Sequence, residues 1–124
     1  MPRTPHFRLD EVKAFVAFPD AILLSKTRAR AFFSTPRLAA EAAVQMLREL
    51  TEEAFVETKF QNPDVCDVYA YQPRQPILAR LAGAEVACRA WYVKLTLLPD
   101  HLLLVSFHPL ERPIRTARGR KVMP

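Results

Sequence analysis

Hydrophobic and polar residues alternate most clearly between Arg89 and His108. This stretch consists of two apolar arms on either side of Pro99-Asp100-His101, and both arms are rich in the aliphatic and aromatic residues that strands favour. Because successive side chains of a strand point to opposite faces, each arm has one apolar face. These faces comprise Trp91, Val93, Leu95 and Leu97 on the first arm, and Leu103, Val105 and Phe107 on the second. The pattern therefore predicts a β-hairpin.

The two apolar faces must be buried together, since a slip of one residue between the arms would expose one of them to water. With a three-residue turn, this requirement pairs Tyr92 with His108 and Lys94 with Ser106. A phenol, an imidazole, an ammonium group and a hydroxyl are then expected on one patch of the opposite sheet face. We take this patch as the candidate site.

Apolar residues recur at helical spacing in two other segments. The first helix is predicted within residues 3–16. The second is predicted from Pro36 to about Leu50, with Thr35 as its N-cap. Its buried stripe is expected to comprise Leu38, Ala39, Ala42, Ala43, Met46, Leu47 and Leu50.

Shorter segments are predicted from local signals. They are an edge strand at Ala21–Leu24, a short helix over Lys26–Phe33 capped by Ser25, an extended segment at Val56–Phe60, a strand at Val65–Tyr71, and an ambiguous segment at Ile77–Glu85.

The length of 124 residues and the hydrophobic content of 50% suit one domain with a single core. No apolar run reaches the roughly 18 residues that a membrane span needs, and the first residues lack the apolar stretch of a secretory signal. Two cysteines, Cys66 and Cys88, are too few for a disulfide framework. We therefore expect a cytoplasmic protein with reduced thiols, in which Cys66 packs as a small apolar residue.

The net charge of +5 is carried by the end of the chain. Residues 112–124 contain five basic side chains and no acidic one, whereas the remainder contains 13 of each sign. Such a basic tail suits a phosphate backbone or an acidic protein partner. The alternative is a solvated, disordered end, because Pro113 and Gly119 argue against a regular helix there.

Three motifs resemble, in order and spacing, the toxins of the motility quorum-sensing regulator (MqsR) family. They are RTPHFRLDEVK near the start, DVY at residues 67–69 and YVKLTLLPDHLLLVSF at residues 92–107. The family comprises RelE-like endoribonucleases of bacterial toxin–antitoxin pairs. The resemblance implies an α+β, RelE-like fold with N-terminal helices packed on a mostly antiparallel C-terminal sheet. It makes residues 1–111 a single toxin domain and leaves 112–124 as the tail.

The same resemblance implies cleavage of mRNA without a metal or other cofactor, and neutralisation by a cognate antitoxin. Tyr92 matches the family's active-site tyrosine, and Lys94 matches the lysine two residues further on. Lys59 is the cation nearest to a position where the family has a lysine. This chain departs from the family pattern at three functional positions, which are occupied by Glu57, Cys66 and His108.

Metal-free RNA cleavage needs a base for the attacking 2′-OH, a cation for the phosphate and an acid for the departing 5′-oxygen, and it is specific for RNA through the 2′-OH. An unperturbed imidazole titrates at about 6.5, which suits His108 as the base or acid. Tyr92 suits the partner acid, and Lys and Arg suit the phosphate. We therefore expect catalytic roles for Tyr92, His108 and Lys59, and RNA-binding roles for Lys94, Arg74 and Ser106.

Two functions remain open from the sequence. The first is a metal-independent endoribonuclease toxin, which Tyr92 and Lys94 favour. The second is a catalytically impaired relative that serves as an RNA- or protein-binding module, which Glu57, Cys66 and His108 favour. The scattered histidines and cysteines show no metal-ligand spacing, so no metal is expected.

Overall fold

The computed structural model describes residues 4–25, 36–61, 64–74 and 89–124. Its centre is a five-stranded sheet in the order β1-β5-β4-β3-β2, in which β1 runs parallel to β5 and all other neighbours are antiparallel. The strands are β1 (Ile22–Leu24), β2 (Phe55–Gln61), β3 (Asp64–Tyr71), β4 (Trp91–Leu97) and β5 (Leu102–Pro109). The predicted edge strand before residue 25 and the predicted strand at Val65–Tyr71 are both confirmed.

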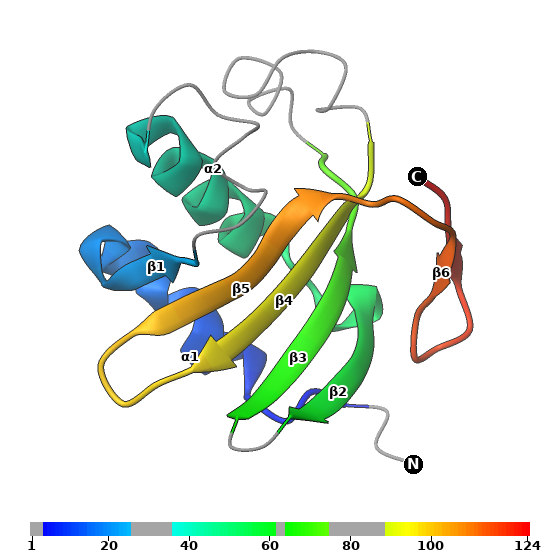
Figure 1. The fold of residues 1–124 in the computed structure, drawn as a ribbon, viewed down its shortest axis with the longest axis horizontal. Helices are drawn as coiled ribbons and strands as arrows, with labels where there is room; N and C mark the ends of the chain where they lie inside the picture. Colours follow the sequence, from blue (N-terminus) through cyan, green and yellow to red (C-terminus); the bar gives the residue numbers. More distant parts are fainter. Residues whose placement is uncertain (1–3, 26–35, 62–63, 75–88) are drawn as a thin grey trace.

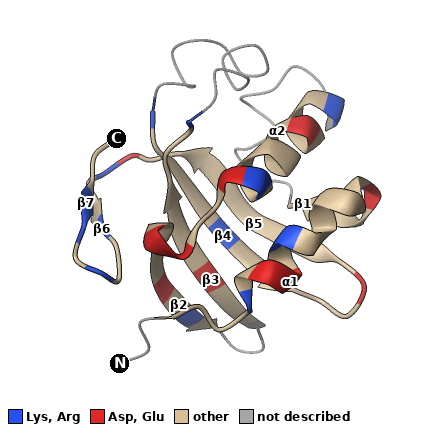
Figure 2. Ribbon diagram, turned by 180° about the vertical axis from the view of Figure 1, so that it is seen from behind, with Lys and Arg blue, Asp and Glu red and all other residues tan. Residues whose placement is uncertain are grey.

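Two α-helices, α1 (Leu9–Lys13) and α2 (Pro36–Glu49), cover one face of this sheet, as Figure 2 shows. The opposite face is turned toward the viewer in Figure 1, and no helix of the described ranges covers it. The expectation of an α+β fold with N-terminal helices on a mostly antiparallel sheet is therefore confirmed. This one-sided arrangement leaves the second sheet face, called the open face below, without a helix over it in the described ranges, although Cys66, Val68 and Ala70 of β3 are buried on that face.

The predicted stripe of α2 forms much of the core. Its members are buried, except for the half-buried Leu38. They pack with aromatic side chains of the sheet, among which the Trp91 and Phe107 rings have centroids 4.8 Å apart. The first helix is shorter than predicted and continues as a 3-10 turn at Ala14–Ala17. The Lys13 ammonium donates to the Leu50 carbonyl oxygen at 2.9 Å, next to the end of α2.

The hairpin of β4 and β5 has the predicted register at one end only. Tyr92 pairs with His108 as expected, but a bulge follows and leaves Val105 without a direct partner. The bulge brings Leu102 and Leu104 into the core in place of Leu103 and Val105, which are half-buried. The prediction for this half of the second arm was therefore wrong, because four consecutive apolar residues allow either face to be buried.

The turn of this hairpin is also longer than the predicted three residues. Residues 98–101 connect the strands, and the Leu98 N–H donates to the His101 carbonyl oxygen at 2.8 Å.

A buried aspartate holds the N-terminal segment against the sheet. Asp67 on β3 is completely buried, and its carboxylate accepts backbone N–H bonds from His6 at 3.0 Å and Phe7 at 2.9 Å. The Thr58 hydroxyl on β2 donates a third bond at 2.6 Å. Three donors replace the water that this carboxylate loses on burial.

Residues 112–124 form an ordered structure rather than the disordered end that was one of the two alternatives. Strands β6 (Ile114–Arg115) and β7 (Lys121–Val122) pair as a short hairpin. Gly119 has a φ of +88° in its turn, a conformation that suits glycine. The Ala117 N–H donates to the Phe55 carbonyl oxygen at 2.8 Å and so attaches this hairpin to β2.

Several predictions fall outside the described residues. They are the helix over Lys26–Phe33, the Thr35 cap, the segment Ile77–Glu85 and the second cysteine, Cys88.

Two buried tyrosines, Tyr69 and Tyr71, are expected to make the fold sensitive to alkali. Burial raises the pKa of both phenols, and the nearby carboxylates of Asp67 and Glu49 add to the effect. Above pH 10 the unfolded chain loses these protons while the folded chain keeps them. The free energy of unfolding should therefore fall by about 1.4 kcal/mol per pH unit for each tyrosine.

Urea unfolding followed by circular dichroism between pH 8 and pH 11 measures this slope. The variant Tyr71→Phe should show a shallower fall than the wild type, because one of the two titrating groups is gone. Equal slopes in the two proteins would contradict the assignment.

Candidate active site on the open sheet face

Tyr92 and His108 stack on the open face of the sheet. Strands β4 and β5 place them as direct cross-strand partners, and their ring centroids are 5.3 Å apart with an interplanar angle of 18°. Their neighbours Trp91 and Phe107 are completely buried on the helix-covered face, so the pleat turns this pair outward. The predicted pairing of the phenol and the imidazole is therefore confirmed.

A contact with the backbone determines which imidazole nitrogen of His108 can exchange a proton. Its Nδ1 lies 2.9 Å from the Pro109 carbonyl oxygen. Because a carbonyl oxygen only accepts hydrogen bonds, Nδ1 carries the proton in this contact. In the neutral ring, Nε2 is then the nitrogen that can accept a proton from a substrate.

The two rings line an open cleft of about 410 Å³. Its other wall is the segment that follows β5, which consists of Leu110, Glu111, Arg112, Pro113 and Ile114. The cleft is within the size range of ordinary small-molecule sites. Arg112 is exposed and lines the same cleft as the two rings, so a cationic residue borders the cleft.

Sequence reasoning did not assign Arg112 to the site, because it treated the residues from 112 onward as a separate tail. Its position only four residues after His108 was the one feature of the sequence that could have assigned it to the site.

Lys94 and Ser106 form the next outward-facing pair on β4 and β5, as predicted. In the register of the sheet, Lys94 pairs with Val68, which pairs in turn with Glu57 on β2. An acidic residue therefore lies in the same row as Lys94 and Ser106. The structure brings this second predicted pair to the site, one row along the sheet from the two rings.

Lys59 does not join the Tyr92–His108 pair. It pairs with Cys66, which lies four residues before Ala70, the partner of Tyr92 on β3, so Lys59 lies two strands across the sheet and four residues along it from Tyr92. With strands about 4.8 Å apart and a rise of about 3.3 Å per residue, the two Cα atoms are separated by roughly 16 Å. Cys66 itself is buried, in agreement with a packing role.

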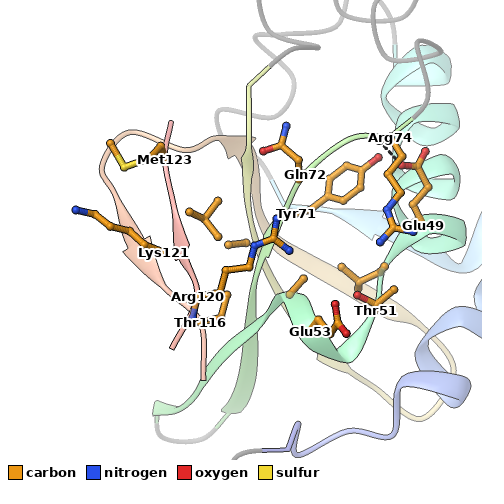
Figure 3. Close-up of a pocket in the computed structure, with 14 residues that line it drawn as sticks. Glu49, Thr51, Glu53, Tyr71, Gln72, Arg74, Thr116, Arg120, Lys121 and Met123 are labelled. Carbon is orange, nitrogen blue, oxygen red and sulfur yellow. Dashed lines mark hydrogen bonds between the residues drawn. The ribbon is translucent and has the colours of Figure 1, made fainter. Parts of the chain in front are cut away.

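Arg74 also lies away from the Tyr92–His108 pair. It follows β3, and its backbone N–H donates to a carboxylate oxygen of Glu49 at 2.6 Å. Its side chain lines a second cavity that shares no residue with the cleft of Tyr92 and His108 (Figure 3). The structure therefore separates two of the predicted site residues, Lys59 and Arg74, from the pair that they were expected to assist.

No known family model and no curated protein sequence matches this chain. Among the residues that the structure describes, no three His, Cys, Asp or Glu side chains gather as a metal-binding group. No helix within the same ranges is long and apolar enough to cross a membrane.

Proposed function

We propose that this protein is a metal-independent endoribonuclease of the RelE-like type, acting in the cytoplasm on mRNA and neutralised by a cognate antitoxin. The proposal follows the resemblance of its motifs to MqsR toxins. The observation that carries it is the stacked Tyr92–His108 pair, which lines a cleft together with Arg112. An acid–base pair and a cation at one cleft are the groups that cleavage by the 2′-OH requires.

In the proposed reaction, Nε2 of His108 takes the proton of the 2′-OH as its oxygen attacks the phosphorus. The new O2′–P bond forms while the P–O5′ bond breaks, and the Tyr92 hydroxyl gives its proton to the departing 5′-oxygen. The products are a 2′,3′-cyclic phosphate and a 5′-hydroxyl end. Proton exchange with water then restores both side chains.

Cations near the pair would hold the phosphate. The Arg112 guanidinium offers the planar fork that suits two phosphate oxygens. Lys94 and Ser106, one row along the same face, lie where an adjacent nucleotide would cross the sheet. We assign these three residues to binding rather than to proton transfer.

Incubation of the purified protein with RNA in the presence of EDTA, followed by mapping of the new ends, tests the proposal. We expect fragments that end in a 2′,3′-cyclic phosphate, and a fall in rate of about a hundredfold or more for Tyr92→Phe. The matched control is Tyr71→Phe, which removes a hydroxyl from outside the cleft and should cleave like the wild type. Intact RNA after prolonged incubation would refute the proposal.

Glu57 favours the second candidate function, a binding module without catalysis. It places an acid where the resembling family has a lysine, in the same row as Lys94. Such a module would retain RNA in a salt-sensitive manner without producing new ends, and Tyr92→Phe would not change its affinity. The same end-mapping experiment therefore separates the two functions.

A further inference from the structure

The β6–β7 hairpin at the end of the chain is uniformly basic. Residues 114–122 contain four basic side chains and no acidic one, and all four are exposed. Figure 2 shows these basic positions together along the hairpin. The hairpin continues directly from the segment that forms one wall of the Tyr92–His108 cleft. An RNA strand that leaves this cleft along that wall therefore meets a surface of positive charge.

Two of these cations are direct partners across the hairpin. Arg115 on β6 pairs with Lys121 on β7, and both residues are exposed. Direct cross-strand partners project from the same side of a strand pair, with Cβ atoms about 5 Å apart. The neighbouring pair, Ile114 and Val122, is half-buried, so the pleat turns Arg115 and Lys121 toward solvent. The hairpin thus presents two positive charges at one place on its outer side.

This arrangement is unfavourable for the hairpin itself. Like charges directly opposite each other destabilise a strand pair, and a hairpin with only two paired positions is marginal on its own. Among the described residues, neither Arg115 nor Lys121 forms an ion pair with a carboxylate. The Arg115 guanidinium donates to the Gly119 carbonyl oxygen at 2.8 Å, which is an uncharged acceptor. Packing therefore does not account for the pair, whereas an anion bound between the two cations would offset their repulsion.

The other two cations of the hairpin have different surroundings. The Arg118 guanidinium lies 3.9 and 4.0 Å from two carboxylates of the 3-10 helix at residues 52–54. The Arg120 side chain is directed toward the second cavity, while the Lys121 side chain points away from it (Figure 3). Arg115 and Lys121 are therefore the two cations of the hairpin that an external ligand can reach together.

Backbone contacts hold the hairpin in place. The buried Thr116 donates its N–H to the Arg120 carbonyl oxygen at 2.8 Å, and its hydroxyl accepts the Arg120 N–H at 3.0 Å. The bond from the Ala117 N–H to the Phe55 carbonyl oxygen attaches the same turn to β2. Because the backbone that carries the two cations is already ordered, little conformational entropy is lost when a ligand binds to them.

We propose that Arg115 and Lys121 form a second phosphate-binding site, which holds a backbone phosphate of the RNA strand outside the cleft. The site rests on the proposed function, because its ligand is the RNA that is cleaved between Tyr92 and His108. Arg112 borders the cleft and lies three residues before Arg115, so their Cα atoms are at most about 11 Å apart. One strand can therefore contact both places, with a guanidinium fork from arginine and a point charge from lysine.

Fluorescence anisotropy of the full chain with a 2′-O-methylated RNA of about 12 nucleotides tests this site. This RNA lacks the attacking hydroxyl, so binding is measured apart from cleavage. The double variant Arg115→Gln with Lys121→Gln should bind roughly tenfold more weakly in about 0.1 M salt, and its slope of log affinity against log salt should be smaller by about 1.4. The matched control, Arg37→Gln with Arg48→Gln, removes two charges from exposed positions of α2 and should keep the slope of the wild type.

Reversal of one charge separates ligand binding from a structural role. Lys121→Glu places opposite charges across the hairpin, so its melting temperature should equal or exceed that of the wild type. Its affinity for the same RNA should fall below that of Lys121→Gln, because a negative charge repels the phosphate. A lower melting temperature together with the affinity of the wild type would assign the pair to the fold and overturn the site.

Cleavage of short and long RNA distinguishes a failure of this site from a failure of the proposed function. A dinucleotide that fills only the cleft should be cleaved equally by the wild type and the double variant, whereas the KM for longer RNA should rise by roughly tenfold in the variant. RNA that binds with the expected salt slope but stays intact would support the site and refute the cleavage. Cleavage with the same KM and salt slope in the double variant and the α2 control would overturn the site, and the pair would then fit an acidic protein partner.

Discussion

Replacement of His108 by alanine is expected to lower the rate of RNA cleavage by about 10²–10⁴-fold, the usual contribution of a well-placed acid or base. The imidazole stacks on Tyr92 at a centroid distance of 5.3 Å, and its Nδ1 is held by the Pro109 carbonyl oxygen. The substitution removes Nε2, the ring nitrogen that can accept a proton from a substrate, from the cleft. Single-turnover cleavage of a short RNA, with RNA affinity measured in parallel, separates the loss of rate from a loss of binding.

A second histidine provides the control for this prediction. His101 lies in the turn of the same hairpin and outside the cleft, so His101→Ala should cleave at the rate of the wild type. His108→Lys, which introduces the residue that the resembling family has there, should retain some activity and require a higher pH. The reason is that the ammonium group of lysine loses its proton only at a pH far above the range in which an imidazole does. Equal rates for wild type and His108→Ala would contradict a proton-transfer role.

Replacement of Asp67 by alanine is expected to lower the free energy of unfolding by about 3 kcal/mol. Its carboxylate is completely buried and accepts bonds from His6, Phe7 and Thr58. Removal of the acceptor leaves two backbone N–H groups and a hydroxyl without a partner, and each such loss costs about 1–3 kcal/mol where water cannot enter. Part of this cost is relieved because the N-terminal segment is only partly buried.

Urea unfolding at pH 7 measures this effect, with Asp100→Ala as the control. Asp100 is exposed in the β4–β5 turn, so its replacement removes the same group without breaking a buried network. Limited proteolysis should also cleave Asp67→Ala in the first ten residues before the wild type, because the segment loses its attachment to β3. A loss of stability equal to that of Asp100→Ala would show that the three bonds contribute little.

The sequence predicts the β4–β5 register where alternation is strict and loses it where alternation stops. From Trp91 to Leu95 apolar and polar residues alternate, so only one face can be buried, and Tyr92 and His108 are paired as predicted. From Leu102 to Val105 every residue is apolar, and both faces satisfy the pattern. A bulge then decides which side enters the core, and nothing in the local sequence indicates it.

Contacts between segments that are distant in the chain are a second feature of the fold that the sequence does not indicate. Asp67 binds residues about 60 positions earlier in the chain, which no local pattern predicts. Lys59 and Arg74 have suitable chemistry for a phosphate, but strand order and register place them away from Tyr92. Arg112 reaches the cleft because the chain turns back after β5 instead of ending there.

The bond from the Ala117 N–H to the Phe55 carbonyl oxygen has a practical consequence for the design of expression vectors. The last residues of the chain supply one wall of the Tyr92–His108 cleft and one wall of the cavity around Tyr71. A purification tag fused after Pro124 would therefore sit beside both, whereas the described part of the N-terminal segment, residues 4–25, lines neither. Truncation before Arg112 would open both cavities at once.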